Sequence, residues 1–181
     1  MLTEHSDIID PKLLPAKGKY LRYYLLGIAE EAGSFSISIR LQPDTKFGVV
    51  IDPLFKVMQP KNNRVVLELF KRVLNCGRVI EKSTQPDILE FVVDNRRHLK
   101  EKVIPFFKRY KPIIKQREFA LFTQVIDALE AGKHRDAESL KELVVMLYEH
   151  SDERRYPLEM ILKEIDERKY RLLRDHKPST P

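Results

Sequence analysis

Residues 20–42 read YLRYYLLGIAEEAGSFSISIRLQ, and the hydrophobic period of this stretch changes halfway along. Up to Ala32 the apolar side chains recur at the spacing of an amphipathic helix, whereas from Ser34 onward apolar and polar residues alternate strictly, as in a half-buried strand. Gly33 stands at the change, which predicts a helix end in left-handed geometry, because only glycine adopts that geometry without strain. The stretch therefore predicts a helix that leads directly into a strand.

Two acidic residues, Glu30 and Glu31, occupy the last predicted turn of this helix. Unpaired carbonyl groups at a helix C-terminus carry partial negative charge, so a carboxylate there costs about 0.3–1 kcal/mol. Carboxylates beside unpaired carbonyls are also the ligands that hard cations such as Mg²⁺ or Ca²⁺ prefer. The pattern leaves two interpretations open, a cation site or a pair of solvated acids at a frayed helix end.

Composition and charge narrow the class of protein. The chain has 181 residues, a formal net charge of +6 and a pI near 9.3, which suits a single domain and favours a polyanionic partner. Its single cysteine, Cys76, excludes an internal disulfide and a cysteine-cluster zinc site. No apolar run reaches the ~20 residues that span a bilayer, and no targeting signal is evident. We expect an intracellular protein, cytoplasmic or organellar, without a membrane partner.

The remaining sequence predicts an α+β fold. Residues 1–18 contain Pro11 and Pro15 and are interpreted as an extended basic arm. A second strand is expected over 47–59, interrupted at Asp52 and Pro53, because proline in a strand implies an edge or a bulge. The other expected elements are a helix capped by Asn62 or Asn63, antiparallel strands over 78–82 and 88–93, a helix capped by Asp94 and irregular at Pro105, and helices over 118–131, from Asp136 and from Pro157 to about Asp175. The expected organisation is a core over 19–132 and a helical extension of the same domain over 133–181.

Several blocks of the sequence resemble, in order, the LAGLIDADG homing endonucleases. Residues 26–35 resemble the signature motif, and blocks over 46–53, 55–59, 77–79, 94–97 and 102–107 are similar to the single-motif branch encoded in ribosomal-RNA introns. The resemblance covers roughly residues 20–126. It implies an αββαββα fold whose antiparallel, saddle-shaped sheet lies on helices and enters the DNA major groove. It also implies a site-specific endonuclease that cuts double-stranded DNA by metal-assisted hydrolysis.

A single copy of the motif has consequences for assembly. By the resemblance, one motif per chain implies a homodimer of two-fold symmetry on a long pseudo-palindromic DNA site. Gly27 lies in the helix interior, where it costs about 1 kcal/mol relative to alanine. Gly27 would let two motif helices cross closely, with Tyr23 and Glu30 in the same interface. The alternative for Gly27 is a packing role within one chain.

The polar faces of the strands are the expected DNA contacts. In the first strand Phe35, Ile37, Ile39 and Leu41 alternate with polar residues, so one face can lie on helices while the other meets DNA. Arginine and glutamine can read base edges bidentately, and serine reaches bases or phosphates. The expected contact residues are Ser36, Ser38, Arg40, Gln42, Lys46, Lys56, Met58, Arg78 and Lys82. The alternative is an ordinary solvated sheet face.

The chain departs from the family pattern at the metal site. The acid that binds metal in the family immediately precedes the last glycine of the motif, and Ala32 occupies that position. Glu31 matches a position that supplies a backbone carbonyl to the metal, and a shift of one residue turns a helical side chain by about 100°. Three explanations stay open: Glu31 substitutes, the lineage has kept binding and lost cleavage, or the change is deliberate. Loss of the carboxylate predicts weak or absent cleavage.

Three further residues complete the centre that the resemblance implies. Gln59 matches a position that orders solvent or metal near the scissile phosphate, Lys115 resembles the basic catalytic residue, and Arg64 is a second basic candidate. The expected cofactor is Mg²⁺, with Ca²⁺ as a non-catalytic substitute. The histidines form no zinc-ligand spacing. The alternative functions are a non-cutting nucleic-acid-binding protein, such as an intron RNA maturase, and a basic protein-interaction module.

Overall fold

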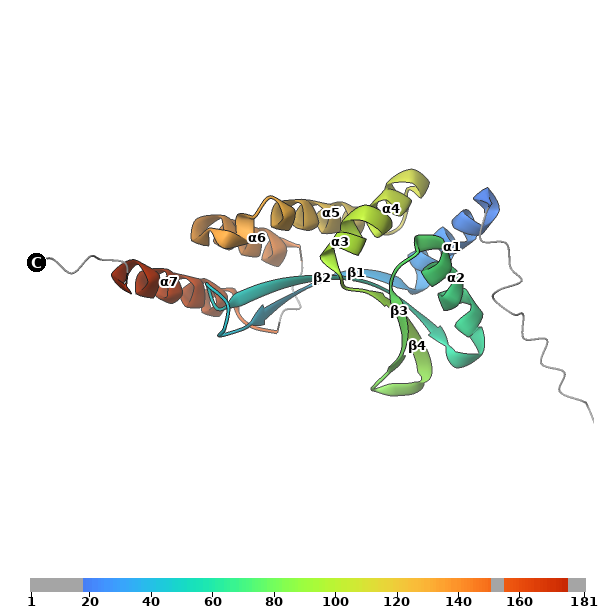
Figure 1. Ribbon diagram of the computed structural model, residues 1–181, viewed down its shortest axis with the longest axis horizontal. Coiled ribbons are helices and arrows are strands. Elements are labelled where there is room, and N and C mark those ends of the chain that lie inside the picture. Colours follow the sequence, from blue (N-terminus) through green and yellow to red (C-terminus); the bar gives the residue numbers. More distant parts are fainter. Residues whose placement is uncertain (1–17, 151–154, 176–181) are drawn as a thin grey trace, which may run out of the picture. The chain divides into compact units, whose positions relative to one another are not determined.

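The computed structural model describes residues 18–150 and 155–175. It has the predicted α+β class, with a four-stranded antiparallel sheet in the order β1-β2-β4-β3 (Figure 1). The chain divides into two compact units: a first unit of residues up to Ser36 and of 54–121, and a second unit of 37–53 and of residues from Phe122 onward. The expected basic arm over 1–17 and the residues after 175 lie outside the described residues. None of the described helices combines the length and apolar character needed to cross a bilayer.

Helix α1 (Lys19–Ala32) passes without a loop into strand β1 (Gly33–Leu41), as the change of period predicts. The predicted left-handed geometry of Gly33 is wrong, because its φ of −95° and ψ of 164° are extended. Glycine is needed here for a different reason. A Cβ added to Gly33 would lie 2.3 Å from the carbonyl oxygen of Ala29, which accepts the Gly33 N–H hydrogen bond. The junction therefore has no room for a side chain.

Strand β2 (Val49–Pro60) is continuous through the Asp52-Pro53 pair, so the predicted interruption is wrong. The segment of β2 that pairs with β4 (Gln85–Val93) begins only at Phe55. The missing N–H of Pro53 therefore removes no hydrogen bond between β2 and β4. Strand β4 also begins before the predicted residue 88, and it pairs on its other side with β3 (Arg78–Lys82).

Helices cover one face of the strands in the first unit. The helical elements are the short η1 (Lys61–Asn63), α2 (Arg64–Leu74), α3 (Arg96–His98), the π-helical turn η2 (Leu99–Val103), α4 (Ile104–Tyr110) and the start of α5 (Gln116–Glu130). Phenylalanine rings join these helices to the strands. The ring centre of Phe55 in β2 lies 5.2 Å from that of Phe107 in α4, and Phe91 in β4 lies 5.7 Å from Phe70 in α2. These four rings are buried and form an aromatic core between sheet and helices.

Two predicted helix caps are not formed by the expected side chains. Asn63 stands before α2 but makes no capping hydrogen bond, and its Nδ2 donates to Oε1 of Gln59 at 3.1 Å. Helix α3 is capped by Asn95, whereas Asp94 forms a bidentate ion pair with Arg78 at 2.6 and 2.8 Å. Hydrogen bonds from this guanidinium hold the pKa of Asp94 below its ordinary value. The π-helical turn η2 lies just before Pro105, so the predicted irregularity falls in the preceding turn.

The second unit joins the β1–β2 turn to the C-terminal helices. These are the rest of α5, η3 (Lys133–Arg135), α6 (Ala137–Glu149) and α7 (Leu158–Asp175), and Asp136 caps α6 as predicted. Lys141 of α6 pairs with Asp166 of α7 at 2.8 Å. Nη1 of Arg168 donates to the carbonyl of Pro43 in the turn at 2.9 Å. Helix α7 therefore packs on both α6 and the β1–β2 turn.

We predict that Gly33→Ala lowers the free energy of unfolding by about 1–3 kcal/mol, the usual cost of forced overpacking. The added Cβ would meet a backbone carbonyl that closes the last turn of α1, so relief requires moving the helix end. The exposed Ser38→Ala in the same strand should change stability by less than about 0.5 kcal/mol. Denaturant unfolding of both variants tests this, and equal stability of the two would contradict it.

Candidate catalytic centre and nucleic-acid interface

Glu30 ties the end of α1 to the start of α5. Its Oε1 accepts hydrogen bonds from the backbone N–H groups of Ile113, Ile114 and Lys115 at 2.6, 2.8 and 3.3 Å. These donors immediately precede the first turn of α5, where a helix leaves N–H groups without internal partners. A carboxylate that accepts from several N–H groups makes charge-assisted hydrogen bonds, which are the stronger kind. Glu30, which the sequence assigns to a dimer interface, thus has a role within its own chain, and it brings Lys115 to the end of α1.

The other two residues of this helix end offer little to a metal ion. Glu31 is exposed, and Ala32 is half-buried and carries only a methyl group. The Oε1 atom of Glu30 is already engaged by three N–H groups. Within residues 18–150 and 155–175, no three His, Cys, Asp or Glu side chains are grouped to hold a metal ion. The donors of one chain therefore do not fit a tightly held divalent cation, which needs several oxygen ligands.

Gln59 and Arg64 have partners near the start of α2. Oε1 of Gln59 accepts from Asn63, and Nη2 of Arg64 lies 3.1 Å from the Glu68 carboxylate. The Arg64 side chain is 58% exposed and that of Glu68 is 26% exposed, and an ion pair one turn apart on a helix contributes only about 0.3–0.5 kcal/mol. Arg64 can therefore exchange Glu68 for a phosphate at small cost. The structure links Lys115 to the end of α1, and it gives Gln59 and Arg64 separate partners.

The strand register places the predicted contacts of the first unit on one face. Lys56 and Arg78 both lie opposite Val92, on its two sides, so their side chains share a face of the sheet. Met58 is two residues along β2 from Lys56 and lies on the same face. Nζ of Lys82 lies 3.7 Å from Sδ of Met58, which adds a further cation. This set, Lys56, Met58, Arg78 and Lys82, is called the strand face below.

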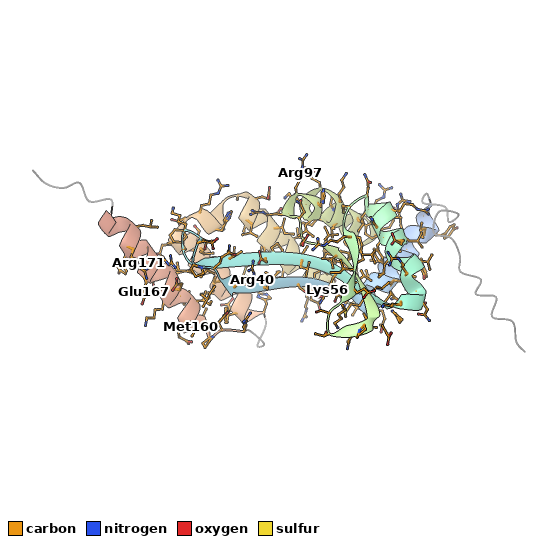
Figure 2. The ribbon with its side chains drawn as sticks, turned by 60° about the horizontal axis from the view of Figure 1, so that its bottom comes forward. Arg40, Lys56, Arg97, Met160, Glu167 and Arg171 are labelled. Atoms are coloured by element: carbon orange, nitrogen blue, oxygen red, sulfur yellow. The ribbon has the colours of Figure 1, made fainter. Side chains whose placement is uncertain are left out.

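The predicted contacts on β1 are mostly exposed or half-exposed. Ser36, in the first unit, shares a 2.6 Å hydrogen bond with the hydroxyl of Ser34. In the second unit Ser38 and Arg40 are exposed, and Figure 2 shows Arg40 beside the long strands. The Arg40 guanidinium pairs with Asp52 at 2.5 Å. Gln42 is half-buried at the end of this strand. Lys46 differs from the rest, because its Nζ donates to the carbonyl of Arg135 at 3.1 Å.

Acidic and amide side chains contact the cations of the strand face in the free chain. Lys56 lies 3.8 Å from Glu90, and Lys82 donates to Oε1 of Gln85 at 2.9 Å. The Arg78 and Asp94 side chains are 53% and 49% exposed. Exposed ion pairs contribute about 0–1 kcal/mol, and the bidentate geometry of Arg78 and Asp94 places theirs at the upper end of this range. A polyanion, whose binding releases counterions, can therefore replace Asp94 as the partner of Arg78.

Comparison with known proteins settles the family. The LAGLIDADG endonuclease family model matches residues 25–126. The chain belongs to the LAGLIDADG endonuclease family. The resemblance seen in the sequence is thereby confirmed, and the endonucleases of this family generally depend on divalent metal ions.

Individual LAGLIDADG relatives match over most of the chain. Homing endonuclease I-ApeII of Aeropyrum pernix is 33% identical over 150 residues, which cover 79% of this chain and 89% of that protein. DNA endonuclease I-CeuI of Chlamydomonas moewusii is 33% identical over 132 residues, which cover 71% of this chain and 61% of I-CeuI. The archaeal intron-encoded homing endonuclease I-Vdi141I, solved in complex with DNA, has a TM-score of 0.78 and 38% identity over 83% of this chain and 98% of that chain. I-CeuI in complex with DNA has a TM-score of 0.77 and 27% identity over 84% of this chain and 78% of that chain.

Sequence reasoning missed the acidic partners of this LAGLIDADG chain. The acceptor role of Glu30 joins groups 83 residues apart in sequence, and no local pattern carries that information. Glu90 lies within β4, and Asp94 directly follows it. Only the strand register shows that these acids face Lys56 and Arg78. An acid facing a cation across two strands becomes predictable once the register is known.

We predict that Glu30→Ala destabilises the chain by about 1–3 kcal/mol, because it removes the acceptor of three N–H groups. The variant should also speed amide hydrogen exchange at Ile113, Ile114 and Lys115. Glu31→Ala is the matched control, since it removes a neighbouring exposed carboxylate. Urea unfolding and exchange measured by NMR test this. Similar behaviour of the two variants would show that the Glu30 hydrogen bonds do not hold the turn.

Proposed function

We propose that this chain binds a specific double-stranded DNA site as a homodimer of the homing-endonuclease type, and that its cleavage is weak or absent. The observation that carries the proposal is the strand face. Lys56, Arg78 and Lys82 lie on one side of the sheet, and the buried aromatic core lies on the other. A strand pair of this kind fits the major groove, where arginine and lysine read guanine. The DNA complexes of I-Vdi141I and I-CeuI support duplex DNA as the partner.

Helix α1 supports the homodimer. Tyr20, Tyr23 and Tyr24 are 90%, 47% and 50% exposed, and nothing in the described chain lies within 4 Å of a Cβ added to Gly27. Their spacing places these four residues on one side of α1, opposite the buried Ala29. The open space at Gly27 argues against a packing role within one chain. A second copy of α1 crossing at Gly27 would cover the tyrosine rings and give a two-fold interface.

The weak cleavage follows from Ala32. In this proposal Mg²⁺ is the ion the reaction requires, and Ca²⁺ would bind without supporting it. Ala32 offers no ligand, and Glu30 is occupied by the turn before α5. A loss of about 1.36 kcal/mol of transition-state stabilisation slows a reaction tenfold. Loss of the metal carboxylate therefore leaves a protein whose binding residues are intact and whose cutting is difficult to detect.

We predict that Ala32→Glu gains Mg²⁺-dependent double-strand cleavage, while the unmodified chain only binds. The substrate is a duplex selected from a random pool by binding to the unmodified protein. Ala32→Gln is the matched control, because glutamine has a similar size and no charge. Gel shifts measure binding and strand-resolved gels measure cutting.

Three outcomes of this experiment would contradict the proposal. If Ala32→Glu binds the duplex and does not cut, Ala32 is not at the metal site. Equal cutting by both forms would identify Glu31 as a working ligand. Preference for intron RNA over every duplex would contradict duplex binding and indicate a maturase.

A further inference from the structure

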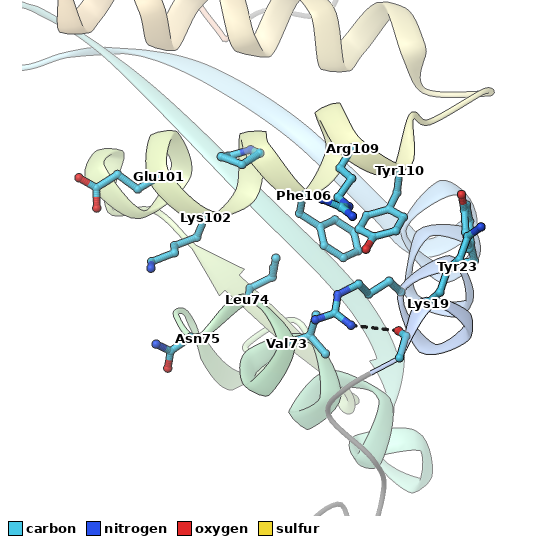
Figure 3. A pocket seen from close by; sticks show the side chains of 13 residues that line it. Lys19, Tyr23, Val73, Leu74, Asn75, Glu101, Lys102, Phe106, Arg109 and Tyr110 are labelled. Atoms are coloured by element: carbon cyan, nitrogen blue, oxygen red, sulfur yellow. Dashed lines mark hydrogen bonds between the residues drawn. The ribbon is translucent and has the colours of Figure 1, made fainter.

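A pocket with a volume of about 760 Å³ opens between α1, α2 and the η2–α4 segment of the first unit (Figure 3). Its walls come from helices, and none of the strand-face residues lines it. The helices that form it cover the buried side of the sheet, as the contacts of Phe70 with Phe91 and of Phe107 with Phe55 show. The pocket therefore lies on the helical side of the sheet, away from the strand face.

The pocket is strongly basic. Lys19, Lys102 and Arg109 line it and are exposed. Arg22 also lines it, with Nη1 donating to the carbonyl of Gly18 at the pocket wall at 3.0 Å (Figure 3). The acid in the lining is Glu101, whose Oε1 accepts from Nε of Arg97 at 2.9 Å. Several cations around a hollow favour an anionic ligand, and arginine suits phosphate in particular because it can donate two parallel hydrogen bonds.

Aromatic rings form another part of the wall. The ring centres of Tyr23 and Tyr110 lie 5.3 Å apart in an edge-to-face arrangement, and Phe106 lies 5.0 Å from Tyr110. Tyr23 also has Nζ of Lys19 at 5.8 Å from its ring centre. Figure 3 shows Arg109, Tyr110 and Phe106 along one wall, with Tyr23 and Lys19 beside them. Aromatic faces beside cations suit a ligand that is both planar and anionic.

We propose that this pocket binds a nucleotide, with its phosphate on Arg109 and Lys102 and its base against the ring of Tyr110. A bare phosphate would leave the rings without a partner, and the volume lies within the roughly 300–1,000 Å³ of organic-ligand sites. A free mononucleotide and an unstacked nucleotide of a single strand present the same chemistry. The site is additional to duplex binding by the strand face, which uses different residues.

The test measures equilibrium binding of two probes, uridine 5′-monophosphate and an eight-nucleotide single-stranded RNA, to the full chain. Arg109→Ala should lower the affinity for the probe that binds about tenfold, which is the loss expected for a charge-assisted phosphate contact. Lys108→Ala is the matched control, because Lys108 is an exposed cation on the same helix that does not line the pocket. Its effect should stay near the roughly twofold expected from long-range charge. Tyr110→Leu should lower the affinity for the nucleotide and leave the affinity for inorganic phosphate unchanged.

The outcomes separate the possibilities. Binding of the RNA alone identifies a single strand as the source, binding of the monophosphate alone identifies a free nucleotide, and binding of both also supports the pocket. No binding of either probe by the unmodified protein overturns the proposal, and so do equal losses in Arg109→Ala and Lys108→Ala. A Tyr110→Leu variant that binds the nucleotide normally overturns the stacking role. Duplex DNA binding by Arg109→Ala should be unchanged, and its loss would show that both ligands use one site.

Discussion

The direct join of α1 to β1 at Gly33 constrains everything that meets there. No loop separates helix and strand, and the 2.3 Å between a Cβ at Gly33 and the Ala29 carbonyl leaves room only for hydrogen. The exposed side of α1 and the first polar residues of β1 are therefore held in one orientation. A second copy that pairs on α1 would fix the direction in which β1 leaves the interface. In the proposed dimer, this covalent junction would couple assembly to the placement of the start of β1.

The residues at the end of α1 have separate roles in structure and in the proposed chemistry. Glu30 is committed to the turn before α5, where its carboxylate accepts from backbone N–H groups and positions Lys115. In the proposed function, Ala32 lacks the carboxylate expected for metal binding at this position. A chain that keeps the structural acid and lacks the chemical one retains its core, its strand face and the exposed side of α1. The architecture of an endonuclease is therefore maintained by interactions that do not depend on its reaction.

The sequence predicts the parts of this fold that burial determines. The change of period locates the α1–β1 junction because it reports which side chains are buried, and the strand expected over 78–82 matches β3. Asp94 misleads because its partner Arg78, 16 residues away, outweighs a local cap, whereas Asn63 stands at the cap position without making the bond. The contacts of Glu30 cross 83 residues of sequence. The Ala32 departure is readable only by comparison with the family motif.

The account depends most on the exposed side of α1 being covered by a second copy of the chain. Sedimentation equilibrium of the full chain at the concentrations used for DNA binding tests this directly. We predict twice the 21.3 kDa mass of one chain. Gly27→Arg should give single chains with an unchanged circular dichroism spectrum, because the added side chain enters space that is open within the chain. A mass of one chain for the unmodified protein, or a dimeric Gly27→Arg, would contradict the account.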